Sequence, residues 1–306
     1  MHFSVIITTY NRANLVSTAI KSVLKQSFQD FELIIVNDAS IDNTEEVVHS
    51  FQDTRIKYIR NKENLHKGGA RNEGIKMAIG QYITFLDDDD HYLPSHLENI
   101  AKRIKKEGQP VAVFYTNVVK TNGKTSQIIK TGPIPKDQDP VSFVFQPWTP
   151  IGAPQATIHR EILTRFNFNT QIRIGQDTEL FMRIAANFPL FYLDSDTFIA
   201  LVHSENSGAL KYNAGKDRLE GYSYIFENEE LSKHIPKSLK NYMISYCYRR
   251  MSDHYEFIGD RKKTFKSAVK ALYYAPGKDF KINTVHILYN FPLIGGLFRS
   301  MRELTR

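Results

Sequence analysis

Short apolar segments alternate with helix-forming segments over the first hundred residues, and this alternation limits the folds that the chain can adopt. Phe3–Thr8, Phe31–Val36 and Tyr82–Leu86 are rich in β-branched and aromatic residues, as expected of strands buried in a parallel sheet. Between the first two, apolar residues recur at helical spacing from Leu15 to Leu24. Two parallel strands joined by a helix form a βαβ unit. The sequence therefore predicts an α/β fold.

The same patterns predict further elements along the chain. The segment from Asp42 to Glu45 has the form of a capping box, in which the Asp42 carboxylate accepts a hydrogen bond from the Glu45 amide and starts a helix that ends near Phe51. The many prolines of residues 131–156 predict a loop that forms a mobile flap beside the site. The other predicted elements are strands at 55–60, 111–119, 190–193 and 197–202, helices at 68–78, 95–106 and 177–187, a hairpin turn at Asn122-Gly123, and helices from about 216 onward.

Carboxylates directly follow two of the predicted strands. Asp38 comes after the second strand, and Asp87–Asp90 come after the strand at 82–86. Because ligands of open α/β sheets bind at the carboxyl ends of the strands, five carboxylates are expected at one edge. Such oxygens can hold a hard divalent cation that also binds phosphate oxygens. The run therefore predicts a metal and diphosphate site, with a solvated acidic turn as the alternative.

Two common phosphate-binding motifs are absent. The first strand is followed by Thr8-Thr9-Tyr10-Asn11-Arg12, without the Gly-x-Gly-x-x-Gly of dinucleotide-binding folds or the Gly-x-x-x-x-Gly-Lys of P-loop proteins. The single cysteine, Cys247, excludes an intrachain disulfide and favours a reducing cytoplasm. We expect no signal peptide and no membrane-spanning helix, because the N-terminus lacks a basic region and no apolar run reaches about 20 residues.

Four motifs, taken together and in order, resemble those of the family 2 glycosyltransferases of GT-A fold. They are FSVIITTYNR at 3–12, FELIIVNDAS with DNT at 31–44, GARNEGI at 69–75 and YITFLDDDD at 82–90. The resemblance is strong over residues 3–110 and loose over 111–205. It implies a Rossmann-like, mostly parallel sheet flanked by helices. The implied catalytic domain is 1–214, with a nucleotide-binding half at 1–110 and an acceptor-binding half at 111–214, followed by a helical extension at 215–306.

The resemblance also implies a UDP-sugar donor and assigns residues to it. Asp38 would accept a hydrogen bond from the uracil N3–H, although a turn-forming role for its side chain is the alternative. Thr9 and Tyr10 would flank the base, the tyrosine by stacking, and Arg12 belongs to the same motif. Arg71 resembles a family arginine near the nucleotide and diphosphate, whose oxygens suit a guanidinium group.

A divalent cation, Mn²⁺ or Mg²⁺, is implied by the same resemblance. Asp87 and Asp89 occupy the positions of the family's Asp-x-Asp motif, the first toward the ribose and the metal and the second as a metal ligand. Asp88 and Asp90 are harder to place: one of them would touch a hydroxyl of the donor sugar, and Asp88 is assigned to the donor. His203 lies in a stretch whose family histidine approaches the diphosphate and the metal, with a buried core histidine as the alternative.

The resemblance places the catalytic base in the segment Gln176-Asp177-Thr178-Glu179-Leu180. Asp177 would take the proton from the acceptor hydroxyl, while Gln176 stands where the family has glutamate. The alternative for Asp177 is a helix N-cap, a position that favours aspartate. One base without a second carboxylate recognisable as a nucleophile favours a single displacement that inverts the anomeric centre.

The activity implied by the resemblance is transfer of a hexose or N-acetylhexosamine to a hydroxyl of a growing glycan. The pathway would be polysaccharide, capsule or lipopolysaccharide assembly, with an acceptor that can be linked to a lipid diphosphate and no nucleic-acid partner. Two alternatives stay open. One is a non-catalytic sugar-nucleotide-binding protein, which Gln176 would indicate; the other is a nucleotidyltransferase, which the absence of a glycine-rich loop disfavours.

Charge is unevenly distributed along the chain. Residues 1–100 contain 10 basic and 14 acidic side chains, whereas residues 231–306 contain 15 basic and 5 acidic ones. From Pro292 to Arg306, apolar residues recur at helical spacing among arginines. This pattern predicts a basic amphipathic helix that attaches the chain peripherally to the anionic inner face of the cytoplasmic membrane. Packing of the helix on the catalytic domain is the alternative.

Overall fold

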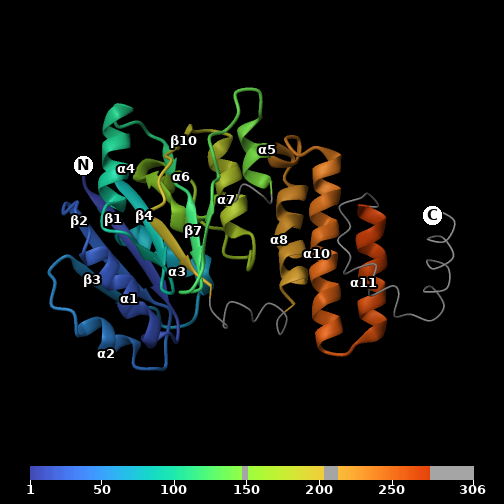
Figure 1. Cartoon of the computed structure of the whole chain (residues 1–306), viewed down its shortest axis with the longest axis horizontal. Helices are drawn as coiled ribbons and strands as arrows, with labels where there is room; N and C mark the ends of the chain where they lie inside the picture. The colour runs from blue at the N-terminus through green and yellow to red at the C-terminus, as the bar shows by residue number, and fades with distance from the viewer. Residues whose placement is uncertain (147–150, 203–212, 276–306) are drawn as a thin grey trace. The chain divides into compact units, whose positions relative to one another are not determined.

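The computed structural model describes residues 1–146, 151–202 and 213–275 (Figure 1). The chain divides into two compact units: the first comprises Met1–His203 and Asn228–His234, and the second comprises Ser204–Glu227 and Ile235–Arg306. His203 and the predicted amphipathic helix at 292–306 lie outside the described residues.

A seven-stranded sheet forms the centre of the first unit and confirms the predicted α/β class. Its strand order is β10-β6-β9-β4-β1-β2-β3, and β9 is antiparallel to both of its neighbours while the other pairs are parallel. The three central strands end level with one another, because Thr9 pairs with Asn37 and Thr8 pairs with Asp87. The strands are β1 (Phe3–Thr9), β2 (Phe31–Asn37), β3 (Ile56–Arg60), β4 (Tyr82–Asp87), β6 (Val113–Tyr115), β9 (Ala156–His159) and β10 (Leu190–Tyr192).

A second, four-stranded sheet has the order β5-β11-β7-β8. Its strands are β5 (His91–Tyr92), β7 (Val118–Thr121), β8 (Ser126–Ile129) and β11 (Phe198–Leu201). The predicted hairpin turn is confirmed, since the Asn122 side chain accepts a hydrogen bond from the Thr125 amide between β7 and β8. The single strand predicted at 111–119 is wrong. The backbone amides of Thr116 and Asn117 bind Gln155 and Ser195 instead of a strand partner, so the chain passes from one sheet to the other.

Helices cover both faces of the central sheet. Along β1, Phe3, Val5 and Ile7 belong to one buried cluster with the apolar stripes of α1 (Ala13–Leu24) and α4 (His96–Lys106). Side chains alternate along a strand, so Ile6 points to the other face. There α3 (His66–Met77) approaches so closely that a Cβ at Gly74 would lie 2.5 Å from Ile6 Cγ2. The sheet is therefore buried on both sides, as its continuous apolar strands require.

The predicted capping box was wrong. Asp42 does not accept from Glu45: it binds the Thr44 amide and hydroxyl through one oxygen and the Ala13 amide through the other, which joins the first turns of α2 (Thr44–His49) and α1. The helix α2 ends at His49, close to the predicted end near Phe51.

The proline-rich segment 131–156 is also not the loop that we predicted. It contains a buried helix, α5 (Pro140–Phe145), and a 3-10 turn, η1 (Ala153–Gln155). Proline suits the first turn of a helix because no amide hydrogen is needed there, and Asp139 caps α5 by accepting from the Ser142 amide. Residues 147–150 of this segment are not described. The unit is completed by α6 (Arg160–Arg165), α7 (Gln176–Ala185) and α9 (Glu229–Ser232).

Three helices make up the described part of the second unit. They are α8 (Ala214–Glu227), α10 (Lys237–Phe257) and α11 (Arg261–Tyr274). At Gly215 a Cβ would lie 2.5 Å from the Cys247 carbonyl oxygen, so α8 packs closely on α10. Among the described helices, none combines the length and apolarity needed to cross a bilayer.

Candidate active site

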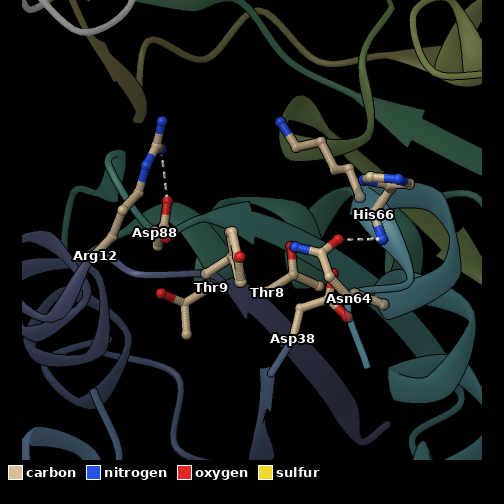
Figure 2. Close-up of a pocket in the computed structure, with 10 residues that line it drawn as sticks. Thr8, Thr9, Arg12, Asp38, Asn64, His66 and Asp88 are labelled. Carbon is tan, nitrogen blue, oxygen red and sulfur yellow. Dashed lines mark hydrogen bonds and ion pairs between the residues drawn. The ribbon is translucent and has the colours of Figure 1, made fainter. Parts of the chain in front are cut away.

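A cavity of ≈ 300 Å³ lies at the edge where β1, β2 and β4 end (Figure 2). Five residues that the sequence assigned to the donor line it: Thr9, Tyr10, Arg12, Asp38 and Asp88. In Figure 2, Arg12 and Asp88 lie on one side of the cavity, Asn64 and His66 on the other, and Asp38 between them. The strand register produces this arrangement, because each of these strands delivers its polar end residues to the same edge.

Asp38 is fixed in the cavity wall by the segment that follows β3. Its Oδ1 accepts from Asn61 Nδ2 at 2.7 Å and from the Leu65 amide at 2.9 Å, whereas Oδ2 has no hydrogen bond to any described residue. The tight turn after β2 is built by Asn37, whose side chain accepts from the Ser40 amide. The turn-forming alternative for Asp38 is therefore wrong, and one carboxylate oxygen is left for a ligand.

The two residues at the end of β1 differ in exposure. Thr9 is buried, and its carbonyl oxygen accepts from the Asp38 amide at 2.9 Å. Tyr10 is 45% exposed and lines the cavity, so its ring is accessible for stacking. Only Tyr10 of this pair offers a broad apolar surface to a bound ring.

Arg12 joins the start of α1 to the aspartate run. Its Nη1 donates to Asp88 Oδ1 at 3.0 Å and to Asp89 Oδ2 at 2.9 Å. The guanidinium is one-third exposed, so a ligand in the cavity can reach it.

The aspartate run is largely buried. The side chains of Asp87, Asp88 and Asp89 are 17%, 6% and 11% exposed, which excludes the solvated acidic turn. Burial raises the pKa of Asp88, with Arg12 opposing it. Burial on its own would raise the Asp87 pKa too, but Lys67 and Arg71 outweigh it and lower that pKa to about 2.

Three carboxylates of the aspartate run form a candidate cation site. Asp87, Asp89 and Asp90 each place one oxygen within 4.8 Å of the others. Burial, together with the charges of Asp87 and Asp89, raises the pKa of Asp90 to about 8. A hard divalent cation would relieve this repulsion, and the all-oxygen donor set suits Mn²⁺ or Mg²⁺. Asp90 was not among the predicted ligands, and His203 lies outside the described residues.

Arg71 is buried between this cluster and the predicted base. The side chain is 1% exposed, and its Nη2 donates to Asp87 Oδ1 at 2.9 Å while its Nη1 donates to Asp177 Oδ1 at 2.6 Å. The rings of Phe85 and Phe168 lie 5.7 and 5.2 Å from the guanidinium carbon. The guanidinium is thus committed to two carboxylates within the chain.

Asp177 is held at both of its oxygens. Oδ1 accepts from Arg71 and Oδ2 accepts from the Ala153 amide at 3.1 Å, yet the side chain is still 26% exposed. The N-cap of α7 is Gly175, with φ of 98°, so the N-cap alternative for Asp177 is wrong. Gln176, which precedes it, is buried.

Sequence reasoning missed the segment from Asn61 to Lys67, which follows β3 and includes the first two residues of α3. Asn61 orients Asp38, Asn64 and His66 line the cavity, and Lys67 pairs with Asp87 Oδ2 at 2.6 Å. The signal was present, since this segment follows the carboxyl end of a predicted parallel strand. It was overlooked because the residues form no recognisable motif.

Comparison with known proteins defines the family. Residues 4–168, more than half of the chain, match the model described as glycosyl transferase family 2. The chain belongs to this family and is a glycosyltransferase, as the sequence motifs predicted. The match favours the enzyme hypothesis over a binding protein or a nucleotidyltransferase.

Curated relatives extend the similarity beyond the matched domain. A Campylobacter jejuni protein named GalNAc(5)-diNAcBac-PP-undecaprenol beta-1,3-glucosyltransferase is 30% identical, and the alignment covers 88% of this chain and 86% of that protein. An uncharacterized glycosyltransferase from Rickettsia conorii is 31% identical over 76% of this chain, which spans only 38% of that longer protein.

Solved structures show the same fold. Staphylococcus aureus TarS 1–349 in complex with UDP-GlcNAc has a TM-score of 0.61 and 18% identity, covering 90% of this chain and 82% of that one. The mannosyltransferase PcManGT from Pyrobaculum calidifontis, in complex with GDP-Man and Mn²⁺, has a TM-score of 0.60 and 16% identity, covering 94% and 84%. The predicted GT-A fold is confirmed.

Proposed function

We propose that the chain transfers a hexose or N-acetylhexosamine from a UDP-sugar to a hydroxyl of a growing glycan. The observation that carries this proposal is the buried Arg71, which holds Asp87 of the aspartate run and Asp177 on one guanidinium beside the cavity. A carboxylate cluster suited to a cation and diphosphate is thereby joined to a partly exposed base. Donor activation and proton removal would occur at the same site.

The donor is assigned to the cavity. Asp38 offers one unbound oxygen to the uracil N3–H, and the exposed ring of Tyr10 can stack on the base. Arg12 and Asp88 would contact the more polar part of the nucleotide-sugar. The UDP-GlcNAc named in the TarS complex supports a UDP-sugar, although that likeness concerns the fold.

A divalent cation would be held by Asp87, Asp89 and Asp90. When bound, it would supply Lewis-acid stabilisation to the negative charge of the departing diphosphate. The Mn²⁺ named in the PcManGT complex supports this assignment. The participation of His203 stays a prediction from the sequence.

Asp177 is proposed as the general base. Its carboxylate accepts the proton of the acceptor hydroxyl while that oxygen forms a bond to the anomeric carbon and the bond to the UDP oxygen breaks. Arg71 and the Ala153 amide fix the carboxylate in place. A single displacement of this kind inverts the anomeric centre, and the β linkage named for the Campylobacter relative is consistent with it.

The acceptor is proposed to be a glycan on a lipid diphosphate. This rests on the undecaprenol-linked glycan in the name of the Campylobacter relative, and it would place the reaction at the cytoplasmic face of the membrane, in polysaccharide, capsule or lipopolysaccharide assembly. We propose that residues 1–214 supply the nucleotide-binding half (1–110) and the acceptor-binding half (111–214) of the catalytic domain, and that Asn228–His234, which belong to the same compact unit, complete it.

An Asp177→Asn variant tests the proposal. Asparagine has almost the same volume but cannot accept the proton, so UDP-sugar hydrolysis should fall by about 10²–10⁴-fold. Binding of UDP with Mn²⁺, measured by calorimetry, should be retained. Asp137→Asn, an exposed position, serves as the control. Loss of UDP binding in Asp177→Asn would make Asp177 a structural residue, and full turnover in excess chelator would refute the cation.

A further inference from the structure

The helix α11 carries an unusual set of charges. It contains five basic residues and no acidic one, and three of the basic residues, Arg261, Lys262 and Lys263, form its first turn. The helix macrodipole favours acidic side chains at that end and disfavours basic ones. Asp260 at the N-cap offsets part of this unfavourable charge, because its carboxylate pairs with Lys263 at 3.0 Å. The other two cations of the first turn, Arg261 and Lys262, therefore oppose the helix macrodipole.

One face of α11 is buried and consists of small side chains. Thr264, Ser267, Ala268 and Ala271 are buried, and two hydrogen bonds fasten this face to α10: Ser245 Oγ to the Ala271 carbonyl oxygen at 2.8 Å, and Ser252 Oγ to the Thr264 carbonyl oxygen at 3.2 Å. The orientation of α11 on α10 is consequently fixed.

The opposite face is exposed along its length. Residues at i, i+4, i+7 and i+11 share one face of a helix, and here they are Lys262, Lys266, Val269 and Tyr273. We call these four residues the α11 stripe. All are exposed, Val269 by 43% and Tyr273 by 80%. Neither lysine of the stripe has an ion-pair partner among the described residues.

The flanks of the stripe are cationic as well. Lys270 lies over the Tyr248 ring at 5.0 Å and Lys263 over the Tyr255 ring at 5.4 Å, so both are held against α10 beside the stripe. The surface thus combines unpaired cations near the helix start with an exposed aliphatic and an aromatic side chain near its end.

We propose that the α11 stripe binds an anionic phospholipid bilayer. Lysines of this kind are attracted to lipid phosphates, while tyrosine prefers the headgroup level, where its ring is shielded and its hydroxyl is hydrated. The exposed face of a helix is convex, which suits a flat membrane better than a single-stranded nucleic acid, whose backbone is followed by a groove. This inference deepens the proposed function, which places the acceptor on a lipid, but it rests on α11 alone.

Vesicle co-sedimentation of the full chain tests the inference without donor or acceptor, so the result is independent of catalysis. The probes are phosphatidylcholine vesicles with and without 30% phosphatidylglycerol, a fraction of about one-third chosen to mimic a strongly anionic leaflet. Each lysine near such a surface strengthens binding about fivefold. Lys262→Gln/Lys266→Gln should therefore weaken binding to anionic vesicles about 25-fold, and Tyr273→Ser should weaken it further.

The control is Lys105→Gln/Lys106→Gln, which removes the same charge from exposed positions on α4 and should bind like the unmodified chain. Melting curves establish that each variant is folded. The inference is overturned if the α11 variants bind anionic vesicles as strongly as the natural chain does, or if the natural chain does not bind them. It is also overturned if the control variant loses as much binding as the α11 variants. Binding to single-stranded RNA that is stronger than to vesicles, and equally reduced by the stripe variants, would assign the surface to nucleic acid instead.

Discussion

Arg71 is a guanidinium removed almost completely from water, and its charge is balanced by carboxylates from two distant segments of the chain. Burying such a group is costly unless it is paired and hydrogen-bonded. The flat guanidinium donates in two directions at once, which a single ammonium cannot do in the same geometry. The family resemblance implied that Arg71 contacts the nucleotide and diphosphate. Its two ion pairs within the chain suit a positioning role better.

Replacement by lysine separates these two roles. Arg71→Lys keeps the positive charge but cannot hold both Asp87 and Asp177, so kcat for donor hydrolysis should fall by about 10²-fold while the KM for the donor changes little. Steady-state UDP release measures both. Arg165→Lys, at an exposed ion pair, is the matched control. A raised KM at unchanged kcat would instead indicate that Arg71 binds the donor.

Glu32 is a second buried charge, and it acts on stability. It accepts from the Ser4 hydroxyl and the Ile79 amide and pairs with Lys57 at 2.6 Å, which ties β1, β3 and the segment before β4 to β2. Burial alone would raise its pKa, but these partners together lower it. The ionised form is thus favoured in the folded state, and its contribution is present above the unfolded-state pKa and is lost as the pH falls through the folded-state value.

A Glu32→Gln variant should accordingly lose about 1–3 kcal/mol of unfolding free energy at pH 7. The difference from the natural chain should narrow below about pH 4.5, as Glu32 begins to be protonated in the unfolded chain. Urea denaturation at pH 7 and pH 4 measures this, with the exposed Glu63→Gln as the control. A difference that is independent of pH would mean that shape, not charge, is what glutamine fails to reproduce.

At the scale of elements, the predictions succeeded where a pattern is local. The buried strands and the stripe of α1 follow directly from hydrophobic periodicity. One failure depended on contacts made at a distance: the break between β6 and β7 arises from hydrogen bonds to residues 155 and 195. The helix α5 was missed because proline at its first turn was taken as a loop signal, although this is the one helical position where proline is favoured.

Gly74 gives an element-scale prediction. Alanine is about 1 kcal/mol better than glycine inside a helix, but a Cβ here would lie 2.5 Å from Ile6 Cγ2 and 3.2 Å from Val36 Cγ2. Overpacking of this kind costs about 1–3 kcal/mol, so Gly74→Ala should lower the urea midpoint. Lys76→Ala, on the exposed face of the same helix, should leave it nearly unchanged. A stabilised Gly74→Ala would show that α3 can move away from the sheet.

At the scale of the whole molecule, the sequence correctly predicted the edge of the sheet at which the site forms. It predicted fewer of the contacts within the site. The position of carboxylates after strands sufficed to bring Asp38 and the aspartate run together. The bond from Arg71 to Asp177 spans 106 positions, and no local pattern indicates it. The role of Lys67 likewise depends on where α3 begins, because the helix starts at His66, two residues before the predicted start at 68.

The segment Asn228–His234 belongs to the first unit although the chain on either side of it belongs to the second. Leu231 is 2% exposed, and His234 Nδ1 lies 3.0 Å from Asp139 Oδ2, on the residue that caps α5. The first unit is therefore not a continuous piece of polypeptide. A shortened protein that ends at residue 214 would lack Asn228–His234, which belong to the first unit. The shortest protein that contains the whole first unit must extend at least through His234, and it therefore also includes α8.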